Sequence, residues 1–411
     1  MRANSDFKKL GQGRIIAAQF LKLPSGLQVL LCIRILREKA ANYDFHSNFM
    51  KHELKAITIL GCSLLLTGFC LLGLVENWFV AGQWLLQAAL LWGLVVQYIW
   101  RRLALNRANA ETPLYSNLGW GNRLTILRGL LIALTGGFLF QQQTNDVNVL
   151  LPAILYTLAA ILDRLDGYVA RRSQQVSLLG NELDITFDAL GLVVAPLLAI
   201  GLGKLHWSYL MLSVAYYIYQ WGLLRRQRRG LPVYALPPNP LRRTLAGFQM
   251  AFIAAVLWPL LSSSLTVIAG IAFMLPVLFG FVVDWLIVSG SFPAQILTTL
   301  DLLSWKFFQP VLRVLLVLVS FLAIRNSGQL WQADMSEWVF IFSAGLILFG
   351  FAGRLGAFAL IMLLGWQYPD TGGHFFDYVL IFTASWILLL GTGRYSLWQW
   401  GDEWVARYDG A

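Results

Sequence analysis

One stretch of this chain decides the fold we expect: DRLDGYVARRSQQVSLLGNELDITFD, residues 163–188. Asp163 and Asp166 lie three residues apart, and two small residues, Gly167 and Ala170, continue the same spacing. Side chains three, four and seven positions apart share one face of an α-helix. The pattern therefore predicts a helix with two carboxylates and an open strip of small residues on one face.

The second half of the stretch repeats this arrangement with a period of four. Gly180, Asp184 and Asp188 fall on one face of a following helix. Because the connection between the two helices is short, we expect them to be antiparallel neighbours whose four carboxylates converge.

Four converging carboxylates repel one another, and ionisable groups at membrane depth are costly and usually functional. Isolated aspartates at helix ends are most often simply solvated. Here the aspartates belong to a pattern that fixes eight positions between residues 163 and 188, which solvated helix ends do not require. A hard divalent cation such as Mg²⁺, which takes oxygen ligands and shares them with phosphates, is the natural compensation. Arg171 adds a forked donor suited to a phosphate group.

The composition around this stretch is that of a polytopic membrane protein. Of the 411 residues, 58% are hydrophobic and 13% are charged, and the mean hydropathy is +0.63. A soluble protein has about a quarter charged residues. Apolar stretches long enough to span a bilayer as helices are expected near 56–76, 79–100, 124–141, 149–163, 184–203, 206–224, 244–262 and 265–288.

The net charge of +10 follows from membrane topology and does not call for a nucleic-acid partner. Arginines gather in segments 101–123, 164–183 and 225–243, which strict alternation of the spans places on one side. The positive-inside rule puts this side, and the four aspartates with it, in the cytoplasm.

We expect an all-α chain with four parts. Residues 1–53 form a basic cytoplasmic or interfacial segment, 54–110 a transmembrane hairpin, 111–292 a six-helix core, and 293–411 a membrane bundle of about four shorter helices. The stretch from Pro293 through Asp301 and Lys306 to Pro310 is expected not to span. Asp284 is expected near the cytoplasmic end of its helix and solvated there; the alternative is that it lines the active cavity.

The segment 163–188 matches the signature D-x2-D-G-x2-A-R-x8-G-x3-D-x3-D at every fixed position and resembles the CDP-alcohol phosphotransferase family over about 115–290. The resemblance implies a six-helix homodimer with a pair of Mg²⁺ or Mn²⁺ ions. By position, Asp163, Asp166 and Asp184 correspond to metal ligands, and Asp188 to the general base that also touches the second metal.

The same resemblance implies further site residues. Gly167 and Arg171 correspond to residues that contact the CDP group, and Ser177 to a hydroxyl near the nucleotide. The substrate-binding positions expected in all are Gly167, Ala170, Arg171, Ser177, Gly180, Asn122, Thr125 and Arg128. The last three come from the stretch 122–128, which resembles the start of the family's first helix.

The reaction implied is transfer of a phosphoalcohol, here phosphatidyl from CDP-diacylglycerol, to an alcohol acceptor with release of CMP. Arg128, Arg172, Arg225 and Arg226 suggest a pocket for a phosphorylated alcohol, although each is also explained by the positive-inside rule. Two alternatives are an ion-coupled membrane carrier, which needs no nucleotide-facing residues, and a non-catalytic scaffold that acts through its C-terminal bundle.

The C-terminal bundle ends in Gly391-Thr-Gly-Arg-Tyr-Ser-Leu397 after an apolar helix. This ending, together with Arg313 near the start of the first helix of the bundle, resembles DoxX-like four-helix membrane proteins. Trp398 departs from that pattern, which often has an acidic residue there, and a generic helical bundle is the alternative.

Overall fold

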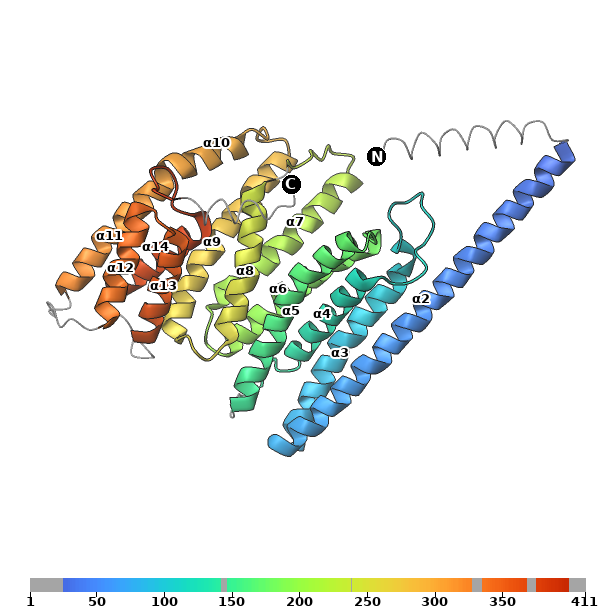
Figure 1. Cartoon of the computed structure of the whole chain (residues 1–411), viewed down its shortest axis with the longest axis horizontal. Helices are drawn as coiled ribbons and strands as arrows, with labels where there is room; N and C mark the ends of the chain where they lie inside the picture. The colour runs from blue at the N-terminus through green and yellow to red at the C-terminus, as the bar shows by residue number, and fades with distance from the viewer. Residues whose placement is uncertain (1–24, 142–145, 238, 327–334, 368–374, 399–411) are drawn as a thin grey trace.

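The computed structural model of the chain describes residues 25–141, 146–237, 239–326, 335–367 and 375–398. These residues form helices and their connections, as the long apolar runs predict (Figure 1). The helices are α2 (Ser25–Val75), α3 (Trp78–Arg102), η1 (Leu103–Leu105), α4 (Trp120–Gly136), α5 (Asp146–Arg172), α6 (Leu178–Gly201), η2 (Trp207–Leu210), α7 (Met211–Arg228), α8 (Pro240–Leu257), α9 (Ser263–Val288), α10 (Ile296–Leu303), the π-turn η3 (Ser304–Phe308), α11 (Gln309–Asn326), α12 (Met335–Phe349), α13 (Gly353–Gln367) and α14 (Phe375–Leu390).

Five stretches among the described residues are helical, long and apolar enough to cross a membrane. They are Phe45–Val75, Trp78–Leu105, Leu178–Gly201, Ser263–Val288 and Ile296–Arg325. Large apolar side chains cover much of their surface; Phe79, for example, is 83% exposed. Exposed apolar area on this scale suits contact with lipid tails. The prediction of an all-α, multi-pass membrane protein is confirmed.

Two expected breaks in the helices are missing. Helix α2 continues without interruption past residue 53, where the sequence suggested that an interfacial segment ends; residues 1–24 of that segment lie outside the described part. The stretch 293–310, which we expect not to span, is helical from Ile296 and continues directly into α11. Pro310 does not break this helix, since it sits at the first turn of α11, directly after the π-turn.

The helices form a row in which sequence order is largely spatial order (Figure 1). The α2–α3 hairpin lies at one end, α4 to α9 occupy the middle, and α11 to α14 form the other end. One apolar core joins the hairpin to α4–α9, and a second joins α11–α14 to Leu265 and Ala269 of α9. Helix α9 thus contributes to both cores.

A buried guanidinium holds the last bundle together. Arg313 of α11 donates hydrogen bonds to the carbonyl oxygens of Ile347 (3.0 Å) and Leu348 at the end of α12. It also donates to the carbonyl oxygens of Thr392 and Arg394, each at 3.2 Å. Arg313 therefore caps one helix end and fixes the chain after α14, which accounts for the arginine singled out in the sequence.

Glu53 of α2 fastens the N-terminal hairpin to the middle helices. Its carboxylate accepts hydrogen bonds from Arg123 of α4 at 2.7 Å and from the backbone N–H of Leu118 at 2.9 Å. Leu118 lies just before α4, so Glu53 fixes the position at which this helix begins. Its side chain is only 15% exposed, which strengthens both bonds relative to a solvated pair.

We expect Glu53→Ala to destabilise the protein by about 1–3 kcal/mol, the usual cost of leaving a charged hydrogen-bonding group without its partner. Melting of the purified protein in detergent measures this. Lys55→Ala, at an exposed position two residues away on the same helix, is the control. Equal melting temperatures for the two variants would contradict the anchoring role of Glu53.

Candidate active site

The four aspartates of the signature lie one or more turns inside their helices. Asp163 and Asp166 belong to α5, and Asp184 and Asp188 to α6. We expected α5 and α6 to be antiparallel neighbours. Instead α4 packs closely against both, and the backbones of α5 and α6 approach each other closely at few positions. The carboxylates still converge, because the oxygen atoms of Asp163, Asp184 and Asp188 lie within 4.8 Å of one another.

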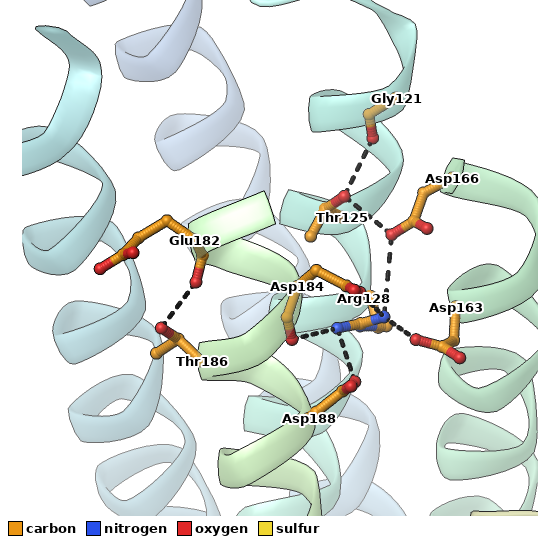
Figure 2. Close-up of polar contacts among 9 residues, drawn as sticks. All are labelled: Gly121, Thr125, Arg128, Asp163, Asp166, Glu182, Asp184, Thr186 and Asp188. Atoms are coloured by element: carbon orange, nitrogen blue, oxygen red, sulfur yellow. Dashed lines mark hydrogen bonds and ion pairs between the residues drawn. The ribbon is translucent and has the colours of Figure 1, made fainter. Parts of the chain in front are cut away.

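Arg128 of α4 stands at the centre of this group (Figure 2). Its Nη1 donates to Asp163 Oδ1 and, at 3.0 Å, to Asp184 Oδ1, and lies 3.7 Å from Asp166 Oδ2. Its Nη2 donates at 3.0 Å to Asp188 Oδ1 and to the backbone oxygen of Asp184. The Arg128 side chain is 2% exposed, so one buried cation faces all four carboxylates.

Thr125, one turn before Arg128, orients Asp166. Its hydroxyl is 2.8 Å from Asp166 Oδ2 and 3.1 Å from the carbonyl oxygen of Gly121. Gly121 lets the helices approach closely here, since a Cβ atom at this position would lie 2.7 Å from the Cβ of Ala170. Ala170, expected to face a substrate, thus forms part of the α4–α5 contact.

Asn122, Ser177 and Gly180 form a buried polar cluster of their own. The Asn122 amide donates to Ser177 Oγ at 3.1 Å and to Asn106 Oδ1 at 2.9 Å. Ser177 caps α6 by accepting a hydrogen bond from the Gly180 N–H at 2.9 Å. A Cβ atom at Gly180 would lie 2.7 Å from Asn122 Oδ1. These residues therefore lock the start of α6 against α4.

Gly167 and Arg171 stay on the more open side of α5. A Cβ atom at Gly167 would lie 3.3 Å from Arg171 Nη1, so the guanidinium lies along the glycine. Arg171 is exposed. The Arg171 guanidinium, a charged hydrogen-bond donor, is therefore held next to the Gly167 backbone, which no side chain covers.

The four arginines suggested as an acceptor pocket have different surroundings in the structure. Arg128 is held by the carboxylates, and Arg172 is exposed. Arg225 lies over the Trp221 ring, 5.1 Å from its centre. Arg226 donates to the carbonyl oxygens of Pro232 and Ser289.

Two contributors to the site had no signal in the sequence. Asn106, in the connection after η1, is 1% exposed and bonds Asn122. Glu182, between Gly180 and Asp184, turns away from Arg128 (Figure 2) and accepts hydrogen bonds from Tyr98 (2.9 Å) and Arg102 (3.1 Å) of α3. Neither residue is in a recognisable motif, and both act through helix packing that spacing alone does not reveal.

The ligand atoms present fit a hard divalent cation. All of them are carboxylate oxygens, the set that Mg²⁺ and Mn²⁺ prefer, and three come from groups close enough to share one ion. The guanidinium of Arg128 already neutralises part of the negative charge at this point.

Arg128→Met should lower the melting temperature in divalent-free buffer, because Asp163 and Asp166, whose side chains are 18% and 7% exposed, then lose the cation that pairs with them. Since the carboxylates then lack their cation, added Mg²⁺ should raise the melting temperature of this variant more than that of the wild type. Arg172→Met, at an exposed position, is the control. The same Mg²⁺ response in all three proteins would refute this role of Arg128.

Comparison with known proteins agrees with the geometry of the site. The family model of CDP-alcohol phosphatidyltransferases matches residues 120–282, from the start of α4 into α9. No match was found among curated proteins or among solved structures. Nothing supports a DoxX-like domain in the C-terminal bundle, where Arg313 has the structural role described above.

The matched region contains all four aspartates, Arg128 and the Asn122–Ser177 cluster. It favours a transferase over an ion-coupled carrier or a non-catalytic scaffold. Residues 120–282 are therefore a CDP-alcohol phosphatidyltransferase domain, which belongs to a family of transferases.

Proposed function

We propose that the protein transfers phosphatidyl from CDP-diacylglycerol to the hydroxyl of an alcohol acceptor and releases CMP, as a step of phospholipid synthesis. The family acts on a CDP-alcohol donor and an alcohol acceptor. The observation that carries the proposal is the convergence of Asp163, Asp184 and Asp188 with Asp166 around one buried arginine.

We assign Asp163, Asp166, Asp184 and Asp188 as the ligands of Mg²⁺ or Mn²⁺, with two ions when substrate is bound. A divalent ion bound there would neutralise the pyrophosphate and stabilise the leaving CMP. Asp166 keeps its orientation through Thr125, and Arg128 holds the other three carboxylates in place.

Asp188 is our candidate for the general base. It is the carboxylate farthest along α6, and besides facing Arg128 it borders an apolar cavity between α6, α7, α8 and α9. An acceptor hydroxyl beside this carboxylate would be within reach, as proton transfer requires. The hydroxyl oxygen forms the new bond to phosphorus, Asp188 receives the proton, and the phosphorus–oxygen bond to CMP breaks.

Gly167 and Arg171 are assigned to the CDP group. The bare backbone at Gly167 allows close approach, and the exposed guanidinium beside it is a suitable partner for phosphate. Ser177, Gly180, Asn122 and Ala170 support this surface mainly by holding α4, α5 and α6 together.

The proposal includes a cytoplasmic active site and a homodimer. The arginine-rich α3–α4 and α7–α8 connections lie toward the same edge of the molecule (Figure 1), which supports one basic side under the positive-inside rule. The dimer follows from the family resemblance alone.

Asp184→Asn and Asp188→Asn should each reduce CMP release from CDP-diacylglycerol by at least about 100-fold, because each removes a charge from the reacting centre. Purified protein with Mg²⁺ and a panel of alcohols, including glycerol 3-phosphate and inositol phosphate, is the assay. Glu182→Gln is the matched control: this carboxylate is on the same helix but bonds α3. Wild-type turnover in both aspartate variants would contradict the proposed mechanism.

Chelation gives a second, independent result. Treatment with EDTA should abolish CMP release, and Mg²⁺ or Mn²⁺ should restore it, whereas Ca²⁺ should restore less because its larger and looser coordination suits the small carboxylate cluster poorly. Full activity in chelator would rule out the metal assignment.

A further inference from the structure

Asp188 lines a cavity that does not include the other three aspartates of the signature. It lies between α6, α7, α8, α9 and α10, and most of its lining is apolar. Representative lining residues from each helix are Leu192, Leu212, Leu245, Val277, Leu297 and Leu300. A site with this lining favours a hydrocarbon chain over a sugar or a phosphate group.

One wall of this cavity comes from outside the transferase domain. The family match ends at residue 282, whereas Leu297, Leu300 and Asp301 belong to α10. These three positions are spaced i, i+3 and i+4, so they present one face of α10 to the cavity. The neighbouring Leu302 is 58% exposed and is not part of the lining.

The charged groups of the lining are few. They are Asp188, Asp301 and the pair Arg242–Asp284, whose atoms Nη2 and Oδ1 are 2.6 Å apart. Asp284 is thus paired and 8% exposed. The expectation that its carboxylate is solvated is therefore wrong. The alternative, that Asp284 lines the same cavity as Asp188, agrees with the structure. Because Arg242 is already paired, the cavity offers no unpaired cation for a phosphorylated alcohol.

We propose that this cavity holds an acyl chain of the lipid substrate, and that α10 limits the length of chain that the enzyme accepts. The inference rests on the proposed function, because it assigns Asp188 to the reacting end of the same lipid. The acyl chain belongs either to CDP-diacylglycerol or to a lipid acceptor, since both lipids present the same hydrocarbon to the cavity. Each buried methylene group strengthens binding about fourfold, so a small change in the α10 wall has a measurable effect.

Photolabelling tests occupancy directly on the full-length protein. Two probes are used: CDP-diacylglycerol and diacylglycerol, each with a diazirine near the end of one acyl chain. We expect one of them to label α10 within 296–303, and the probe that does so identifies the source of the chain. Labelling confined to other helices, such as α13 at Phe358 and Met362, would overturn the proposal.

Chain-length selectivity gives the functional test. Leu300→Trp fills part of the cavity. We measure CMP release with dioleoyl and with dioctanoyl substrates and take the ratio of the first rate to the second. This ratio should fall by at least about tenfold, as expected when roughly two methylene groups lose their burial. Leu302→Trp, the matched control on the exposed face of α10, should keep the wild-type ratio. Leu300→Ala should shift the ratio in the opposite direction, which guards against a folding defect in the tryptophan variant.

The two proposals fail in different ways. If the wild-type protein releases no CMP with any donor and acceptor, the proposed function is wrong. If it releases CMP but Leu300→Trp and Leu302→Trp show the same chain-length ratio, α10 has no part in substrate choice and only the inference fails.

Discussion

The structure depends on one electrostatic constraint: four carboxylates at one point need a cation, and Arg128 supplies it. Buried charges are tolerated only when they are paired and hydrogen-bonded. Helix α4 packs against both α5 and α6, and this place brings its one guanidinium within reach of aspartates on both helices. A divalent ion entering the cluster would take over part of that neutralising role.

The helices outside the transferase domain bear directly on this centre. Glu53 of α2 fixes the start of α4, and Asn106 bonds the Asn122–Ser177 cluster that locks α6 in place. On the other side, α10 closes a cavity that reaches Asp188. We therefore regard the N-terminal hairpin as support for the catalytic helices and α10 as a candidate part of the substrate site, with α9 shared between the two cores.

The sequence predicted the helices, the membrane class and the four aspartates on two helix faces, since all of these follow from hydropathy and from periods of three and four residues. It did not predict that α4 separates α5 from α6, because spacing within a helix does not determine which helix packs between two others. For the same reason Arg128 was expected at an acceptor pocket, and Asp284 in solvent. Each position depends on a partner from a distant helix, Asp163 to Asp188 in one case and Arg242 in the other.

The central claim is that the carboxylates around Arg128 form the divalent-metal centre of a CMP-releasing transferase. Electron paramagnetic resonance of Mn²⁺ titrated into the purified protein with CDP-diacylglycerol tests it most directly. The account predicts protein-bound Mn²⁺ in the wild type and in Glu182→Gln, and its loss in Asp163→Asn and Asp184→Asn. The same bound Mn²⁺ in all four proteins would contradict the assignment.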